Sequence, residues 1–210
     1  MDFLTNPNIL FFIATYLIAS IPFGSLLADK FAGVNIKQSG SKSIGATNVL
    51  RVVKQSNPAL AKKLSIATVV LDALKGAIII LIAILVNMPT ETLWGIALLA
   101  VLGHCYSIYL NFEGGKGVAT GLGVFLILIP VPTLIGAITW AFCAKVLKVS
   151  SLSSLLGLTA IVISAIILND GLNIGSNAPM YMIAFIIFYK HIPNIIRLIK
   201  GQESKSTLKN

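Results

Sequence analysis

Long apolar stretches separated by short polar ones make up most of the chain. A helix needs about 20 mainly apolar residues to cross the hydrocarbon core of a bilayer, and several stretches approach that length. The pattern predicts seven membrane-crossing helices, at about residues 9–27, 64–86, 92–110, 118–129, 133–147, 155–168 and 179–199. We therefore predict an all-α integral membrane protein, a bundle of about seven transmembrane helices that forms one domain over residues 1–210.

The fourth, fifth and sixth predicted helices are short for a bilayer crossing. They require local thinning of the membrane, or extension into the neighbouring loops. Pro130 and Pro132 separate the fourth helix from the fifth, because proline removes a backbone donor and ends helices. If the short helices fold back, the chain crosses five times with the same orientation of its termini. We prefer seven crossings because the prolines mark a turn.

Charged residues are few, and the basic ones concentrate in particular loops. Charged residues make up 11% of the chain, against about 25% in a typical soluble domain. Basic residues gather between residues 30 and 63 and again from residue 190, whereas the segments 1–8, 87–91, 130–132 and 169–178 hold no Lys or Arg. Because basic loops beside membrane helices face the cytoplasm, we predict an outer N-terminus and a cytoplasmic C-terminus. The net charge of +9 does not indicate nucleic-acid binding, since no basic, aromatic-rich domain stands apart from the helices.

Two opposite charges lie inside the second predicted helix. Asp72 and Lys75 are three residues apart, so they share a helical face. Charges within a membrane are costly, and they usually pair or line a cavity. A structural ion pair and a role in shaping a site both remain open for these residues.

Small and hydroxyl-bearing residues crowd residues 39–51, on the predicted cytoplasmic side. Ser41, Thr47 and Asn48 offer hydrogen-bonding groups, and Arg51 adds a planar guanidinium that pairs well with phosphate. Taken alone, the segment also fits a flexible linker with a helix cap at Thr47 or Asn48.

A glycine-rich loop precedes the fourth predicted helix. It reads Gly114-Gly115-Lys116-Gly117, and such a loop presents backbone N–H groups to an anion while the helix dipole and the lysine add positive potential. It is not a nucleotide P-loop, which requires Gly-Lys-Ser or Gly-Lys-Thr. Phosphate binding is the preferred interpretation over a simple turn.

Two further polar segments face the same predicted side. His191, Asn194 and Arg197 are spaced by three residues, so a helix aligns them along one stripe. A lone histidine is more often structural, but the neighbouring Asn and Arg favour a site. The serines of residues 148–154 are interpreted first as caps of the sixth helix, and second as contacts to an anion.

The acidic residues do not indicate a metal centre. The chain has seven carboxylate side chains, and they are scattered, so no cluster for Mg²⁺ or Zn²⁺ is predicted and no cofactor is expected. A Ser or Cys nucleophile with a local base motif is also missing from the sequence. Any chemistry therefore rests on positive charge, hydroxyl groups and histidine.

Three of these segments together resemble the bacterial acyl-phosphate:glycerol-3-phosphate acyltransferases, and the hydrophobic layout agrees over essentially the whole chain. The first is similar to the family pattern Gly-Ser-Gly-Asn-x-Gly-Ala-Thr-Asn-x-x-Arg, read here from Gly40 to Arg51 with Lys42 in place of Gly and Ser43 in place of Asn. The second comprises Gly103-His104, Phe112 and the run from Gly114 to Thr120. The third contains His191, Asn194, Arg197, Gly201 and Glu203.

This resemblance implies transfer of a fatty acyl group from acyl phosphate to the first hydroxyl of glycerol 3-phosphate. The products are then lysophosphatidic acid and phosphate, made at the cytoplasmic face of the bacterial inner membrane. Acyl-CoA takes no part, and a soluble enzyme that makes acyl phosphate is a possible partner. The expected catalytic residues are Ser41, Arg51, Lys116, His191 and Asn194. The expected substrate-binding residues are Thr47, Asn48, Gly114, Gly115, Gly117, Ser154, Lys190, Arg197 and Glu203.

Two questions stay open at this point. The base for the attacking hydroxyl is either His191 or a phosphate oxygen of the donor, and we prefer the phosphate because no carboxylate is evidently placed to orient the histidine. The alternative function is a membrane transporter of a phosphorylated solute. Transporter sites tend to lie at the bilayer midplane between related halves, whereas this chain shows no internal repeat and gathers its polar residues at one face.

Overall fold

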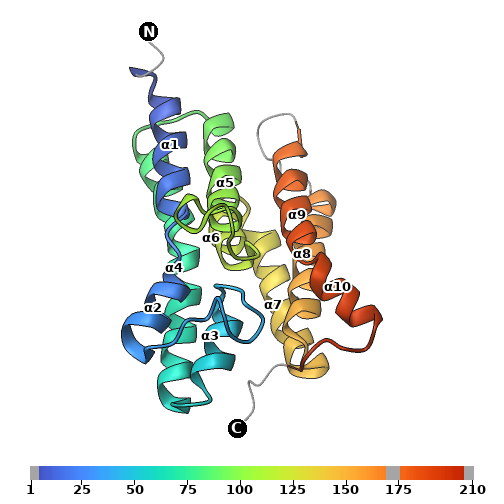
Figure 1. The fold of residues 1–210 in the computed structure, drawn as a ribbon. Helices are drawn as coiled ribbons and strands as arrows, with labels where there is room; N and C mark the ends of the chain where they lie inside the picture. Colours follow the sequence, from blue (N-terminus) through green and yellow to red (C-terminus); the bar gives the residue numbers. More distant parts are fainter. Residues whose placement is uncertain (1–4, 169–175, 206–210) are drawn as a thin grey trace.

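The computed structural model describes residues 5–168 and 176–205, which are largely helical (Figure 1). The membrane-length and shorter helices are α1 (Pro7–Ala19), α2 (Phe23–Ala32), α3 (Ala46–Val53), α4 (Pro58–Leu85), α5 (Thr90–Cys105), η2 (Ile108–Leu110), α6 (Val118–Leu128), α7 (Pro130–Leu147), α8 (Ser150–Ile167), α9 (Ala178–Lys190) and α10 (Ile192–Ile199). In these described residues the β-structure amounts to an isolated bridge between Ser107 and Glu113. The predicted all-α class is confirmed.

Each of the seven predicted apolar segments is largely helical, but the first and the last are broken. The third, predicted over residues 92–110, is also interrupted, because α5 ends at Cys105 and only the short η2 follows. The first divides into α1 and α2 at residues 20–22, where Pro22 precedes α2. The last bends by 53° between α9 and α10, next to His191 and Pro193. Proline explains both breaks, because it cannot supply the N–H that a continuous helix needs. A break separates α6 from α7 as predicted, but Pro130 and Pro132 lie in the first turn of α7 and not in a loop, because proline fits at the start of a helix.

The helix lengths suit an integral membrane protein. Among the described residues, four helical stretches are long and apolar enough to cross a membrane, and a fifth is added if the bent α9–α10 pair is one span. The remaining apolar helices, α5 with 16 residues and α6 with 11, are shorter. Seven crossings and the orientation of the termini stay predictions.

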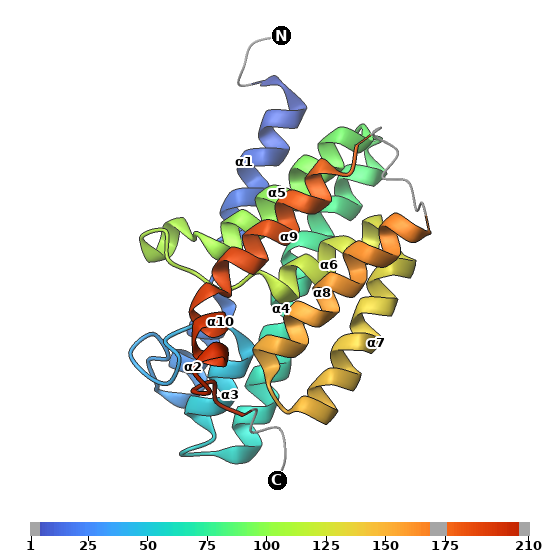
Figure 2. The same ribbon diagram turned by 90° about the vertical axis from the view of Figure 1, so that its right-hand side faces the viewer.

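Helix α4 is the centre of the packing. It contacts α1, α2, α3, α5 and α6, while α7 and α8 form a closely packed pair in which α7 contacts α6 and α8 contacts α9 (Figures 1 and 2). The main core contains fully buried Trp94, Phe125 and Ile183, and a smaller core under α2 and α3 contains Ile36 and Val53. Large apolar side chains also cover the outside of the long helices, including Ile78, Ile138 and Phe185. Such an outer surface fits contact with lipid.

Three short helices and the start of α8 position the polar loops. Figure 2 shows α2, α3 and α10 gathered at the same end of the molecule. Helix α3 begins at Ala46 after Gly45, without a side-chain cap, so the cap considered at Thr47 or Asn48 is wrong and both residues lie inside the helix. Helix α8 begins at Ser150 after Val149, so the predicted serine caps are also wrong. The reason is that the helix includes the serines, whose hydroxyls donate to carbonyls one turn back, as from Ser154 to Ser150.

Candidate active site

A cavity of about 480 Å³ opens between the polar loops and the α6–α7–α8 helices. Its polar lining includes most of the predicted site residues: Ser41, Thr47, Asn48, Arg51, Lys116, Gly117, Ser154, His191, Asn194, Arg197 and Glu203. Its apolar lining includes Leu122, Phe125, Ala137, Trp140, Leu158 and Ile161. Segments far apart in the sequence thus form one cavity with a cationic part and an apolar part.

The other predicted residues lie in a neighbouring cavity. Gly114, Gly115 and Lys190 line that second cavity, which shares Ser41 and Lys116 with the first. The ammonium group of Lys190 donates to the carbonyl oxygen of Cys105 at 2.9 Å and lies 4.5 Å from the centre of the Tyr106 ring. Lys190 therefore connects α9 to the end of α5.

Asn48 organises the first polar segment. Its side-chain amide donates to the carbonyl oxygens of Ile36 and Ser43 at 2.9 and 2.8 Å, and its Oδ1 accepts from the backbone N–H of Ser41 at 2.8 Å. The side chain is 1% exposed. Gly40 has a φ of +64°, and a Cβ there would lie 2.3 Å from Asn48 Oδ1, so a glycine is required. Asn48 holds the loop that presents Ser41 to the cavity.

Two hydrogen bonds join α3 to distant parts of the site. Thr47 Oγ1 and Ser150 Oγ share a hydrogen bond of 3.2 Å, and the Arg51 guanidinium donates to Ser204 Oγ at 2.8 Å. The serine segment and the chain after α10 thereby close around the first polar segment. The remaining N–H groups of the Arg51 guanidinium form no hydrogen bond with another described residue.

The glycine loop is shaped for a close approach to other backbone. Gly115 donates its N–H to the carbonyl oxygen of His104 at 3.0 Å, and a Cβ on Gly114 would lie 2.3 Å from that oxygen. Gly117 has a φ of +81° directly before α6. Lys116 stands between these glycines, and no described carboxylate forms an ion pair with it. Burial, with a further contribution from Arg197 and Arg51 that Glu203 opposes, lowers the pKa of Lys116 to about 8.

His191 is buried at the junction of α9 and α10. Its Nδ1 lies 2.7 Å from the carbonyl oxygen of Ile187. A carbonyl oxygen only accepts, so Nδ1 carries the proton and Nε2 is left as an acceptor. This tautomer provides a lone pair at the wall of the cavity.

Glu203 holds the third polar segment together. Its carboxylate accepts from Asn194 Nδ2 at 2.6 Å, Arg197 Nε at 2.7 Å and Ser151 Oγ at 2.8 Å. Burial favours the neutral form, but the hydrogen bonds from Asn194, Ser151 and Arg197 outweigh it and lower the pKa of Glu203. The ionised Glu203 carboxylate therefore positions Asn194, Arg197 and Ser151, and it does not itself bind a phosphate, because both groups are negatively charged.

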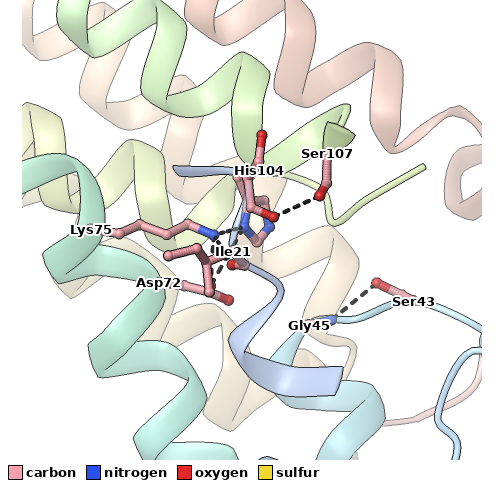
Figure 3. Close-up of polar contacts among 8 residues, drawn as sticks. Ile21, Ser43, Gly45, Asp72, Lys75, His104 and Ser107 are labelled. Carbon is pink, nitrogen blue, oxygen red and sulfur yellow. Dashed lines mark hydrogen bonds and ion pairs between the residues drawn. The ribbon is translucent and has the colours of Figure 1, made fainter. Parts of the chain in front are cut away.

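A buried polar cluster adds a member that sequence reasoning missed. Asp72 and Lys75 form the predicted ion pair at 3.0 Å, and Lys75 Nζ also lies 2.8 Å from His104 Nδ1 (Figure 3). Asp72 and His104 line the main cavity. The available signal was the Gly103-His104 pair at the start of the second motif, but its contact with Lys75 spans 29 residues of sequence.

Comparisons with known proteins agree with this site. The family model for glycerol-3-phosphate acyltransferase matches residues 9–201. The chain is 72% identical to the enzyme of that name from Aliarcobacter butzleri, over 98% of this chain and 99% of that protein. It is 63% identical to the one from a Nitratiruptor species, with the same coverage.

Solved structures show the same relationship. The fold is similar to PlsY (YgiH), an integral membrane glycerol 3-phosphate acyltransferase, in its glycerol 3-phosphate form, with a TM-score of 0.81, 32% identity and 94% of both chains covered. For the lysophosphatidic acid form of PlsY the TM-score is 0.79. The resemblance predicted from the three motifs is confirmed: the chain belongs to the glycerol-3-phosphate acyltransferase family.

Proposed function

We propose that this protein transfers a fatty acyl group from an acyl phosphate to the first hydroxyl of glycerol 3-phosphate, which yields lysophosphatidic acid and inorganic phosphate. The observation that carries the proposal is the single cavity in which cations and hydroxyls adjoin an apolar extension. Both substrates bear a phosphate, and one also bears a long hydrocarbon chain. A cavity with this division suits the pair.

The phosphate groups bind at the cationic part. Lys116 and Arg51 supply positive charge, and Ser41 with the Gly114–Gly117 loop supplies hydrogen-bond donors. Thr47 and Asn48 assist by fixing the first polar segment. The acyl chain lies in the apolar part, beside Phe125 and Trp140, between helices that adjoin the lipid. His191 and Asn194 orient glycerol 3-phosphate, with His191 Nε2 accepting from its hydroxyl, and Arg197 or Lys190 shields its charge. Glu203 holds Asn194 and Arg197 in place.

The reaction needs a good leaving group and a place for one proton. The hydroxyl oxygen attacks the acyl carbon, the bond from that carbon to the phosphate oxygen breaks, and phosphate departs with the electron pair. Cations at the phosphate stabilise this departure, because negative charge builds up on it in the transition state. The hydroxyl proton passes to a phosphate oxygen of the donor. His191 is the alternative acceptor, but a backbone carbonyl, rather than a carboxylate, holds its Nδ1.

The site faces the cytoplasm of a bacterial cell, at the inner membrane. Three observations support this orientation: the basic loops of residues 30–63, the basic segment from residue 190, and outer segments without Lys or Arg. Glycerol 3-phosphate then reaches the cavity from the aqueous side. A soluble enzyme that makes acyl phosphate is a proposed supplier of the donor.

One assay tests the function. The purified protein is incubated with palmitoyl phosphate and labelled glycerol 3-phosphate in the presence of a metal chelator. We expect labelled lysophosphatidic acid and an equal amount of phosphate. Product from palmitoyl-CoA, with none from palmitoyl phosphate, would show that the donor is wrong. No product from either donor, together with glycerol 3-phosphate uptake into protein-containing vesicles, would favour the transporter.

A further inference from the structure

The cluster of Asp72, Lys75 and His104 is buried and tightly connected. The residues are 3%, 4% and 3% exposed. Lys75 Nζ lies 3.0 Å from Asp72 Oδ1, 2.8 Å from His104 Nδ1 and 3.1 Å from the carbonyl oxygen of Ile21. Figure 3 shows these residues facing one another. The contacts of Lys75 with His104 and Ile21 are hydrogen bonds, whereas its contact with Asp72 is an ion pair in which Asp72 Oδ1 has no hydrogen-bond partner among the described residues.

The contacts determine the state of the His104 ring. An ammonium cannot accept a hydrogen bond, so Nδ1 must be the acceptor and the ring proton lies on Nε2. The neutral ring leaves the cluster with the balanced charges of Asp72 and Lys75. Those two residues share helix α4, so their ion pair alone connects no separate elements. The connections to other elements run through Ile21, before α2, and through His104 on α5.

The opposite side of the imidazole lies against the glycine loop. A Cβ built on Gly115 would lie 2.0 Å from His104 Nε2, so the ring directly abuts the backbone at this position. The carbonyl oxygen of His104 also accepts the N–H of Gly115 at 3.0 Å. Lys116 is the next residue. A shift or rotation of the His104 ring therefore displaces the backbone that carries Lys116.

We propose that His104 is a positioning residue, which Lys75 and Asp72 hold in one tautomer and orientation, and that it fixes the Gly114–Gly117 loop for binding phosphate groups. The proposal rests on the proposed function in that the loop binds the phosphates of the substrates. In this proposal the Asp72–Lys75 ion pair contributes to substrate binding as well as to stability, because it orients the His104 ring that contacts Gly115.

Two histidine variants separate the ring's two contacts. His104→Asn keeps an acceptor near Nδ1 for Lys75, but it lacks the atoms that abut Gly115. His104→Gln reaches farther toward the loop. Misplacement of a binding group by about 1 Å costs up to about a hundredfold in rate. We expect His104→Asn to raise the KM for glycerol 3-phosphate and the Kd for inorganic phosphate about tenfold or more, and we expect His104→Gln to recover part of the loss.

A double variant tests the role of the charges. Asp72→Asn/Lys75→Met removes both, so no unpaired charge is left in the membrane. We expect the same weakening of phosphate binding, with the Tm in detergent close to that of Thr15→Val, a control at a buried hydroxyl on α1. If the double variant does not fold, His104→Asn carries the test, because it retains the ion pair.

The measurements are kcat and KM, together with the rise in Tm that added inorganic phosphate produces, which reports binding without turnover. Wild-type phosphate binding in His104→Asn, or a lower Tm with unchanged kcat, KM and phosphate-dependent shift, would overturn the proposal. The proposed function can fail separately. If the wild type binds phosphate but does not use acyl phosphate, loss of phosphate binding in His104→Asn still supports the positioning role.

Discussion

Glu203 Oε1 lies 2.6 Å from the side-chain nitrogen of Asn194, so a residue beyond α10 fixes the side chain of a residue within it. The same carboxylate accepts from Arg197 on the next turn and from Ser151 on α8. One anion thereby holds two polar side chains at the cavity wall and ties α10 to α8. This arrangement explains why a carboxylate belongs in a site built for anionic substrates.

Replacing Glu203 with Gln should weaken both the fold and the site. The neutral amide cannot accept well from Asn194, Arg197 and Ser151 together, and hydrogen bonds to charged groups contribute about 1.5–3 kcal/mol each. We expect a lower Tm and a lower kcat/KM for glycerol 3-phosphate. Asp29→Asn, at an exposed carboxylate on α2, is the control. An unchanged Tm and kcat/KM in Glu203→Gln would contradict the role given to this anion.

Replacing Lys116 with Met should remove phosphate binding and leave the fold intact. Lys116 makes no ion pair with a described carboxylate, so the apolar side chain leaves no charge unpaired. Removing one such transition-state contact costs about 10²–10³ in rate. Steady-state kinetics with both substrates measures the loss, and Lys145→Met, on the exposed side of α7, is the control. Normal turnover in Lys116→Met would mean that the loop does not bind the phosphates.

The lowered pKa of Lys116 predicts an effect of pH. The ammonium is charged below its pKa of about 8 and loses its charge as the pH rises through that value. We therefore expect kcat/KM for glycerol 3-phosphate to be full near neutral pH and to fall above about pH 8 by roughly tenfold per pH unit, because kcat/KM reports the free enzyme. Lys116→Arg keeps its charge at every pH used and should flatten the profile. The same fall in Lys116→Arg would assign the titration to another group.

His191→Gln distinguishes orientation from base catalysis. The glutamine carbonyl can accept a hydrogen bond from the substrate hydroxyl, as His191 Nε2 does in the proposed site, but it cannot take the proton. Because we assign the proton to the donor phosphate, we expect His191→Gln to retain clearly more activity than His191→Ala. A fully active Gln variant would exclude the histidine as the base. Equal, severe loss in both variants would favour the histidine as the proton acceptor.

The sequence predicts the helices and the composition of the site well, for physical reasons. Apolar side chains must face lipid or core along a whole helix, so hydropathy alone reveals α4, α7 and α8. The remaining polar residues must lie at the helix ends and in the loops, because polar groups are costly inside the membrane. Thr47 and Ser150, 103 residues apart, meet because each lies in the first turn of its helix, α3 and α8.

Hydropathy does not reveal which side chains touch. Two examples are the contact of Lys75 with His104 and the hydrogen bond from Asn194 to Glu203. Both depend on how the helices pack and on where they bend, at Pro22 and at Pro193. The serine caps failed for a related reason. Helix α8 starts at Ser150, before the predicted start at residue 155, because serines tolerate a helix when their hydroxyls donate to carbonyls one turn back.

Lys42 provides a test of the departure from the family pattern in the first polar segment. The family pattern has Gly at this position, and Lys42 has a φ of +58°, in the left-handed region that glycine adopts without steric cost. A residue with a Cβ costs roughly 1–2 kcal/mol there, and glycine adds back about 0.5–1 kcal/mol of backbone entropy. We therefore expect Lys42→Gly to raise the free energy of unfolding by about 0.5–1 kcal/mol. Lys42→Ala, which retains the Cβ, is the control and should show no gain.

Enzyme kinetics provide a second test of the Lys42→Gly substitution. The backbone at Lys42 already has the conformation that the family's glycine would have, so the loop held by Asn48 keeps its shape in the variant. We expect the kcat and the KM for acyl phosphate to stay within about twofold of wild type, since distant and independent surface changes perturb free energies by only about 0.5 kcal/mol. A large loss of activity in Lys42→Gly, but not in Lys42→Gln, would show that loop rigidity rather than loop shape limits the reaction. If both variants lose activity, the ammonium of Lys42 itself contributes to binding the anionic substrates.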